Sequence, residues 1–510
     1  MIKITYKLIL LLGLLAMTVT SFAASEAEYG KVSKAWTLHA DGSQEYRSSI
    51  ELTLFTHTAM NSTYGESFIV YNPDFQTLKI HSSYTRQKDG TIVKTPDNAF
   101  VEVLPRFAAD APAYNQLKEM VVVHTGLELG ATIYLDYSII TKPGYYPALD
   151  INERLQETSP VKECKVSISV PEGTPLACGL YGSPVKAVEE SHDGIKEVHW
   201  TLRNIPASSR EAFKPKNREA SPHLVASTYP SGKAALATLD KRLKESQGYE
   251  SKTFAQFLTD KSGNEQEKVN IIRDHILNNL STCPIPMAMT GYTVRDIDTV
   301  LRSAYGTPLE IAQLLNVMLN AAGIPSEVLA VYPGHLDTDA CGLAAIQTLA
   351  VKATVDGKDQ YLSASPLTNR GGLDKVVSLS GTSIEIETTP IQIKESRSVA
   401  ISAGIDSWGM SALNSKRSNL FELPSLIKEE VTYTVTPAEG MKLQTSTKEQ
   451  VISKPFGKVT RTITPRGNTI EVVRTIELDK QQFTPAEYSD VRSLIHEWTN
   501  PDNRVLLFSL

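Results

Sequence analysis

The N-terminal part of the chain alternates apolar and polar positions in short runs. Residues 49–55, 165–170 and 197–202 are examples. A period of two places successive side chains on opposite faces of a β-strand, so that one face is apolar. Asp-Gly and Pro-x-Gly turn signals separate the runs. We therefore expect a β-sandwich-like domain over residues 24–235, ending in a polar, proline- and serine-rich boundary at 203–235.

The pattern changes to a helical period in the middle of the chain. One apolar helix face is predicted from residues spaced three, four and four apart: Val269, Ile272, Ile276 and Leu280. A second helix is predicted to begin at Thr307, because Thr307 and Glu310 form a capping box around Pro308. Gly323 is expected to end that helix.

Two strand-like runs, 326–332 and 348–355, follow this helix. Helices followed by strands predict a compact α+β domain over residues 236–395. The remainder, 396–510, returns to alternating runs and closes with a helical pattern after Thr484-Pro-Ala-Glu487. The fold class is therefore multidomain α+β, with a β-rich domain on each side of the α+β domain.

The first 23 residues have the pattern of a secretory signal. Lys3 and Lys7 precede an apolar run at 8–16, and Ser21-x-Ala23 offers a small-residue cleavage site. The run is too short to span a bilayer, and no later stretch is long enough. We expect cleavage after Ala23 and export to the periplasm, without an integral membrane segment. A lipoprotein anchor is excluded because the first cysteine is Cys164.

The composition and the absence of several motifs exclude a number of protein classes. The net charge is −6, so no domain-wide basic excess is available to bind nucleic acid. Four cysteines exclude a disulfide-dense scaffold or a zinc-ribbon array. No glycine-rich phosphate loop or His-Glu-x-x-His motif occurs. His335 with Asp337-x-Asp339 lacks a further ligand at motif spacing, and we expect neither a metal nor a cofactor.

The middle domain resembles the transglutaminase-like domains of bacterial exported proteins, which share the papain-like α+β fold. The resemblance is carried by the helix body Leu314-Leu-Asn-Val-Met-Leu-Asn-Ala-Ala-Gly-Ile324 and by the strand, turn and strand that follow it. The flanking regions are similar to the uncharacterised β-rich domains that accompany such domains. Features shared with them are Asp41-Gly42, Asp89-Gly90-Thr91, Gly130, Trp200, Ser221-Pro-His-Leu224 and Thr484-Pro-Ala-Glu-Tyr488.

The resemblance fails at the catalytic positions. At the position where the family pattern has its nucleophile, this chain has Pro308. The position of the general base is occupied by Thr348 and that of the carboxylate by Ser363, while the motif glycine is kept as Gly306. A thiolate at a helix N-terminus, a base and an orienting group are the parts that such catalysis needs. Proline supplies no nucleophile, so the resemblance implies a catalytically inactive protein.

We therefore interpret the chain as a binding or assembly protein of the cell envelope, whose partner is a peptide, a glycan or a protein. The inherited ligand groove is expected around Gly306, Thr307, Pro308, Thr348 and Ser363. A purely structural interaction protein, with the middle domain as a spacer, is one alternative.

The other alternative is a cysteine-dependent amidase, protease or cross-linking enzyme. It would use Cys341, six residues after His335, or Cys283 as its thiol. In an oxidising compartment the four cysteines also allow disulfides within domains. Cys164 with Cys178, and Cys283 with Cys341, are the pairings that we consider.

Overall fold

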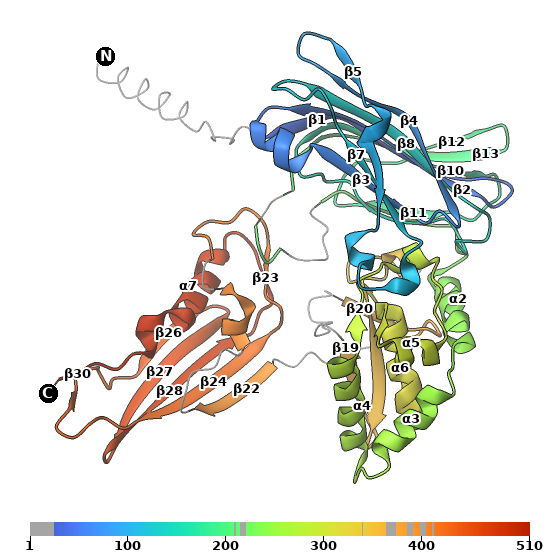
Figure 1. Cartoon of the computed structure of the whole chain (residues 1–510). Helices are drawn as coiled ribbons and strands as arrows, with labels where there is room; N and C mark the ends of the chain where they lie inside the picture. Colours follow the sequence, from blue (N-terminus) through green and yellow to red (C-terminus); the bar gives the residue numbers. More distant parts are fainter. Residues whose placement is uncertain are drawn as a thin grey trace, which may run out of the picture.

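The computed structural model divides the chain into three parts (Figure 1). They are a β-rich N-terminal domain, an α+β middle domain and a β-rich C-terminal domain with a helix near its end, as the sequence predicts. The structure describes residues 25–208, 211–214, 221–338, 340–363, 374–384, 391–397, 404–410 and 413–509. The expected signal segment, 1–23, lies outside these residues.

An eight-stranded sheet is the larger layer of the N-terminal domain. In spatial order its strands are β12 (Val188–His192), β13 (Ile195–Ile205), β10 (Val161–Pro171), β1 (Ala27–Leu38), β2 (Gln44–Leu54), β8 (Thr132–Thr141), β4 (Gln76–Arg86) and β5 (Ile92–Lys94). Only β1 and β10 pair in parallel; the other neighbours are antiparallel. The alternating runs in the sequence lie in β2, β10 and β13.

Two three-stranded sheets pack against this large sheet. One contains β3 (Glu66–Tyr71), β7 (Lys118–Val123) and β6 (Phe100–Val103), and the other contains β11 (Ala177–Tyr181), β14 (His223–Ser227) and β9 (Asp150–Arg154). The first covers β2, β8 and β4 through a core that includes Ile69, Val122 and Leu135. The second covers β10 and β13 around the buried Trp200. This layered arrangement is the expected sandwich.

The expected boundary at 203–235 is wrong as a description of that stretch. It contains β14, the central strand of the second small sheet, and the start of helix α2 (Gly232–Glu245). All five residues of β14 are buried. A strand covered on both faces does not alternate apolar with polar residues, so the period-two signal was absent there.

Helices pack against a five-stranded sheet in the middle domain. The helices after α2 are α3 (Glu250–Thr259), α4 (Glu265–Asn279), α5 (Ile297–Ser303) and α6 (Pro308–Ala321). The sheet order is β19 (Lys358–Ser363), β18 (Thr348–Val355), β17 (Ser326–Pro333), β20 (Asp374–Ser378) and β21 (Ser383–Ile384), and a short pair joins β15 (Ser281–Thr282) to β16 (Tyr305–Gly306). Helix α6 contacts α3, α4, α5, β17 and β18. The predicted helices at 269–280 and 307–323 are confirmed as α4 and α6.

The C-terminal domain is a sheet covered by one helix. The sheet order is β22 (Ile391–Arg397), β24 (Ile427–Val435), β28 (Thr469–Leu478), β27 (Gly457–Arg466) and β26 (Gln450–Lys454). Two short pairs join β23 (Phe421–Glu422) to β29 (Gln482–Phe483) and β25 (Lys442–Leu443) to β30 (Phe508–Ser509). Helix α7 (Tyr488–Thr499), the expected closing helix, buries Val491, Ile495 and Trp498. The boundary expected between 395 and 396 falls inside β22.

An arm of the N-terminal domain reaches onto the middle domain. Its 3-10 turns Arg106–Ala108 and Pro112–Tyr114 lie over the yellow-green elements in Figure 1. Side chains of this arm share a small core with Cys283 and Ile285 of the middle domain. The two domains are thus joined by packed apolar side chains as well as by the chain itself.

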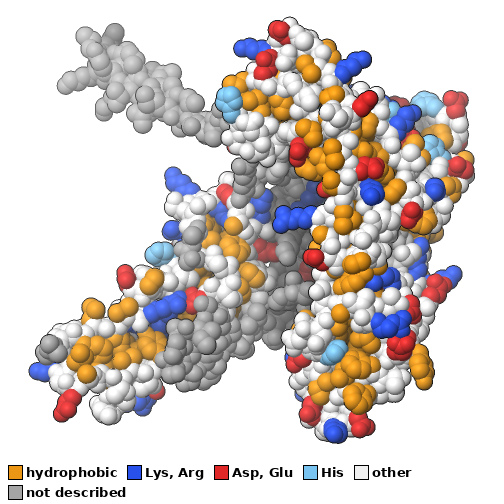
Figure 2. Space-filling model, in the orientation of Figure 1, with side chains coloured by type: hydrophobic (Ala, Val, Ile, Leu, Met, Phe, Trp, Pro, Cys, Tyr) orange, Lys and Arg blue, Asp and Glu red, His pale blue; other side chains and the backbone are white. Residues whose placement is uncertain are grey.

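The surface is mixed in charge on the face that Figure 2 shows, where Lys and Arg lie among Asp and Glu. That face carries no extended basic stripe of the kind that binds nucleic acid. Within the part of the chain that the structure describes, every helix is too short or too polar to cross a bilayer.

Candidate functional site

The start of α6 has the expected capping box. The Oγ1 of Thr307 accepts a hydrogen bond from the N–H of Glu310 at 3.3 Å, and Glu310 Oε2 accepts one from the N–H of Thr307 at 2.8 Å. Pro308 occupies the first helical position, and its missing N–H leaves no donor unsatisfied there. In the transglutaminase-like pattern this position carries the nucleophile.

Glu310 is the centre of a buried polar network below that helix start. Its carboxylate is fully shielded from solvent and accepts hydrogen bonds from the Arg295 side chain at 2.9 and 3.0 Å. The phenol of Tyr114, from the N-terminal arm, donates a further bond at 2.6 Å. Burial alone would raise the pKa of Glu310, but these donors outweigh it and hold the pKa below its ordinary value. Glu310 is therefore ionised, and its hydrogen bonds hold Arg295 and Tyr114 against the start of α6.

Thr348 and Ser363 lie on adjacent strands beside α6. Thr348 opens β18 opposite Val331 of β17, and the backbone of Ser363 pairs with that of Ala350, two residues further along β18. The side chain of Ser363 is outside the described part of the structure. The backbone thus has Pro308 at a helix start and Thr348 and Ser363 on two neighbouring strands.

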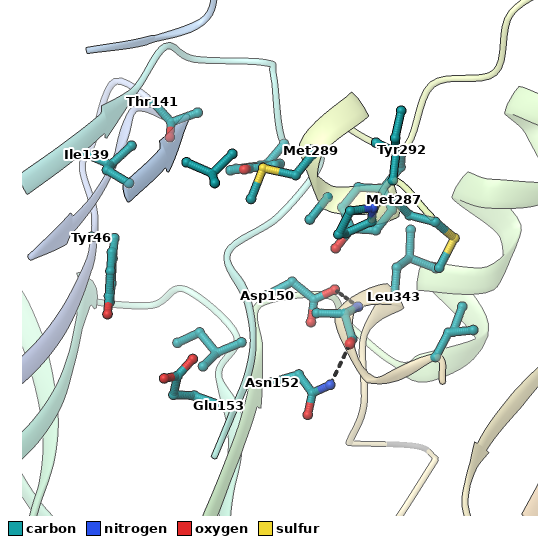
Figure 3. Close-up of a pocket in the computed structure, with 18 of the residues that line it drawn as sticks. Tyr46, Ile139, Thr141, Asp150, Asn152, Glu153, Met287, Met289, Tyr292 and Leu343 are labelled. Carbon is teal, nitrogen blue, oxygen red and sulfur yellow. Dashed lines mark hydrogen bonds between the residues drawn. The ribbon is translucent and has the colours of Figure 1, made fainter. Parts of the chain in front are cut away.

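A cavity of about 890 Å³ lies between the N-terminal and middle domains. We call it the interdomain cleft. One wall comes from β1, β2, β3, β8 and β9, and the other from residues 282–292, Pro308 and residues 343–349. Figure 3 shows Tyr46, Ile139 and Thr141 facing Met287, Met289 and Leu343 across it. Of the expected groove residues, Pro308 and Thr348 line this cleft.

The other two expected groove residues in this segment, Gly306 and Thr307, do not line the interdomain cleft. Both are buried. A Cβ on Gly306 would lie only 3.1 to 3.2 Å from Val300, Glu310 and Ile311, so glycine is required for close packing. The hydroxyl of Thr307 is already engaged by the helix N-terminus. These two residues shape the helix start beneath the cleft without facing it.

Asp150 of β9 joins the two walls of the cleft. Its Oδ2 accepts a hydrogen bond from the backbone N–H of Ala344 at 2.9 Å, and Asn152 of the same strand donates to the Ala344 carbonyl at 2.8 Å (Figure 3). Burial raises the pKa of Asp150 to about 7, although N–H groups of Ala344 and Leu343 partly offset the rise. A carboxyl that titrates near neutral pH in a cleft is a common feature of functional sites.

The candidate thiols are held in protonated form. Cys341 is buried in the core of the middle domain, and burial raises its pKa to about 12, with Asp150 and Asp337 adding to the rise. Burial also raises the pKa of Cys283, whose Sγ lies 3.7 Å from the carbonyl oxygen of Asp110. A catalytic cysteine needs the opposite shift, which a nearby cation or helix N-terminus supplies.

His335, in the connection between β17 and β18, packs in an aromatic cluster. Its ring centroid lies 5.7 Å from that of Tyr181 and 6.1 Å from that of His223, both from the N-terminal domain. The nearby Asp339 lies outside the described residues. Among the residues that are described, no cluster of three or more His, Cys, Asp or Glu side chains is arranged to hold a metal ion.

The two disulfide pairings are wrong, because all four cysteines are free. Cys164 and Cys178 lie in β10 and β11, on opposite layers of the sandwich. Cys283 packs in the small core with the N-terminal arm, whereas Cys341 packs in the core of the middle domain. The two cysteines of each proposed pair therefore lie in different sheet layers or in different cores.

Comparison with solved structures identifies a close relative. The crystal structure of a "putative protease" from Parabacteroides distasonis ATCC 8503 is 95% identical to this chain, covers 95% of it and superposes with a TM-score of 0.92. The match spans 99% of that protein. This chain belongs to the same family.

The flanking domains match two families of uncharacterised proteins. Domain of Unknown Function DUF3857 matches residues 40–209, and DUF3858 matches residues 397–508. None of the curated proteins matches the chain.

More distant structures share only local similarity. A "putative cysteine protease" from Cytophaga hutchinsonii is 15% identical over 47% of this chain and 90% of its own, with a TM-score of 0.21. An M1 zinc metallopeptidase from Deinococcus radiodurans is 11% identical over 39% of this chain and 42% of its own, with a TM-score of 0.20. Neither bears on the chemistry of the cleft.

Sequence reasoning missed most of the cleft wall. Tyr46, Asp150, Met287 and Tyr292 line it and belong to no recognisable motif. The one available signal was Tyr145-Tyr146-Pro147, an aromatic cluster in which Tyr146 does line the cleft. The wall is built from strands distant in sequence, so no local pattern marks it.

Proposed function

We propose that this protein is an exported, catalytically inactive member of its family that binds an extended peptide in the interdomain cleft. The observation that carries the proposal is the composition of the cleft at the helix start. Pro308 and Thr348 line it at the positions where the transglutaminase-like pattern has a nucleophile and a base. A ligand groove retained without its reactive groups binds a chain and leaves it intact.

Peptide chemistry fits the cleft walls best. Apolar and aromatic side chains dominate them, and amide side chains such as Gln44, Gln347 and Asn152 are interspersed. Amide groups pair with peptide N–H and C=O groups, and apolar walls bury side chains. A glycan would need a denser set of polar partners for its hydroxyl groups than these walls provide.

Binding is tested with a library of randomised hexapeptides applied to immobilised mature protein. Peptides retained by the protein are identified by mass spectrometry. Thr348→Trp fills the cleft and is expected to lower retention at least tenfold, while the matched variant Thr354→Trp, on the same strand outside the cleft, retains the peptides. Equal retention by both variants would overturn the proposal, as would retention of glycans from an array in place of peptides.

Export is proposed on the N-terminal sequence. The charged start, the short apolar run and Ala23 support cleavage before Ala24 and delivery to the periplasm. N-terminal sequencing of the protein from the envelope fraction of its own cell is expected to begin at Ala24. An N-terminus at Met1 in that fraction would contradict a cleaved signal.

A cysteine protease is the second candidate function, because the 95% identical relative is named a putative protease. Cys341 and Cys283 are the thiols available near the cleft. Cleavage of the hexapeptide library that is lost in Cys341→Ser or Cys283→Ser would establish this activity. Their raised pKa values argue against it, since a protonated buried thiol is a poor nucleophile.

A further inference from the structure

The second layer of the N-terminal sandwich is interrupted at the interdomain cleft. Its two small sheets end at β3 and β9, and these two strands do not pair with each other. Both line the cleft, β3 with residues 68–70 and β9 with residues 150–153. The large sheet contributes Tyr46, Ile139 and Tyr137 to the same cavity (the first two are labelled in Figure 3). The cleft therefore extends into the gap between the two small sheets.

The hydrogen-bond ladder of β3 shows which of its backbone groups face this gap. The register with β7, continued by one residue, places Gly65 opposite His124, whose N–H donates to the Gly65 carbonyl at 2.9 Å. In an antiparallel pair, hydrogen-bonded positions of this kind alternate with positions whose N–H and C=O groups point away from the partner strand. Glu66, Phe68 and Val70 occupy the alternate positions. Their backbone donors and acceptors are therefore directed to the open side of β3.

No neighbouring strand takes up these outward groups. β3 is the terminal strand of its sheet, and its partner there is β7. Among the residues that the structure describes, no backbone group of a loop is hydrogen-bonded to the backbone of Phe68 or Val70. Phe68 is 58% exposed, and both residues line the cleft. The open edge of β3 thus offers the N–H and C=O groups of both residues to a ligand in the cleft.

The sequence of β3 leaves this edge unprotected. Edge strands ordinarily carry charged residues or proline, which keep other chains from pairing with them. Residues 67–71 of β3 include neither, whereas β12, an edge of the large sheet, carries Glu189 and Glu190. The cleft, at about 890 Å³, is too small to admit a second folded molecule. A single extended chain is the occupant that fits.

A second cavity, of about 350 Å³, follows the same strand. Residues 66–69 line it, and it shares Phe68, Ile69 and Tyr137 with the interdomain cleft. The two cavities together follow β3 over residues 66–70. At about 3.3 Å per residue, this edge is about 16 Å long and matches an extended peptide of about five residues.

We propose that an extended peptide binds by adding a strand to the open edge of β3. The inference rests on the proposed function and states how that peptide is held. Its backbone N–H and C=O groups pair with those of Phe68 and Val70, so affinity depends on the peptide backbone as well as on its side chains. Alternate side chains of the added strand face the rings of Tyr46 and Tyr137, which line the same cavity with their centroids 6.3 Å apart. Peptides with apolar residues at every second position are therefore the preferred ligands.

The first arm of the test uses wild-type protein and one hexapeptide retained from the randomised library. Each backbone amide of this peptide is N-methylated in turn, which removes one donor and no side chain. Alternate N–H groups of a strand point to the same side, so methylation is expected to lower retention about tenfold at every second position and little between them. A loss without this period of two, or no loss at any position, overturns strand addition.

The second arm changes the protein at the same edge. Val70→Pro removes one outward N–H and leaves the ladder with β7 intact, because that N–H takes no part in it. Retention of the unmethylated hexapeptide is expected to fall about tenfold. The control, Glu102→Pro, makes the same change in β6, at the opposite edge of this small sheet and outside the cleft, and keeps wild-type retention. The N–H of Glu102 also points away from β7, since Met120 opposite it is bonded to Ile69. Equal retention by the two variants overturns the proposal.

The outcomes keep the two proposals apart. Failure of wild-type protein to retain any hexapeptide overturns the proposed function and, with it, strand addition. Retention that depends neither on the methylated position nor on Val70→Pro overturns strand addition and leaves peptide binding in place. The methylation scan requires no variant, so it decides the question even if Val70→Pro fails to fold.

Discussion

At the scale of single residues, Asp150 makes the stability of the protein depend on pH. Its pKa in the folded state, about 7, lies above the ordinary 3.8. The folded state therefore favours the protonated form, and the stability it contributes is lost as pH rises from about 4 to about 7. The neighbouring groups coupled to it, Tyr229, Tyr292, Tyr332 and Cys341, all have raised pKa values and stay neutral over that range.

Asp150→Asn should remove this loss. The variant is expected to be more stable than wild-type protein by about 4 kcal/mol at pH 8, with the difference vanishing near pH 4, since a raised carboxyl pKa costs free energy only where the group is ionised. Urea unfolding at both pH values measures it. A difference that is the same at pH 4 and pH 8 would show that the carboxyl does not titrate in this range.

Cys341 is expected to be nearly inert in the folded protein. A pKa of about 12 leaves so little thiolate at pH 7.5 that alkylation by iodoacetamide should be about a thousandfold slower than for an ordinary exposed cysteine. Mass spectrometry of native protein over time, with urea-denatured protein as the control, follows the reaction. Rapid labelling that disappears in His335→Ala would instead favour the cysteine-enzyme alternative.

At the scale of elements, the start of α6 depends far more on Glu310 than on Thr307. Thr307→Ala removes one cap and is expected to cost about 1 kcal/mol. Glu310→Ala removes the fully buried carboxylate that pairs with the partly buried Arg295 guanidinium, and about 3–5 kcal/mol is expected. Thermal or urea unfolding of both variants measures the contrast. Equal costs would mean that Arg295 finds another partner.

A single substitution at the start of α6, Pro308→Cys, is expected to give no catalytic activity. Pro308→Cys would place a thiol at the N-terminus of α6, where the helix dipole favours a thiolate. Thr348, at the position where the family resemblance implies a base, cannot accept the proton, so hydrolysis of glutamine peptides should stay at background. Ammonia release is the assay. Activity from the single variant would reveal a base elsewhere in the cleft.

The elements whose signals are local could be predicted from the sequence. The capping box located the start of α6, and the strand-like run after it located β18 at Thr348–Val355. The fully buried β14 could not be found this way because it has no polar face. The same limit applies to the site. Pro308 and Thr348 were proposed from the family pattern, whereas Asp150 contacts Ala344, which lies 194 positions further along the chain.

At the scale of the whole molecule, the N-terminal and middle domains are expected to fold as one unit. Tyr114 and Ala113 of the arm bond to Glu310 and Tyr305, and Ile285 packs beneath them. A chain of residues 221–509 would leave this surface and Glu310 exposed. We expect it to show no cooperative thermal transition for the middle domain, whereas residues 25–384 melt cooperatively. Cooperative melting of the middle domain within the shorter chain would contradict this coupling.

The order of strands in the large sheet constrains when it can form during synthesis. The first strand in the sequence, β1, lies inside the sheet between β2 and β10. Its parallel partner begins at Val161, so the early β1–β2 hairpin keeps both outer edges open until that residue and those of β8 have left the ribosome. Open strand edges pair readily with other chains. Nascent protein thus has a long interval in which its open strand edges are exposed to pairing with other chains.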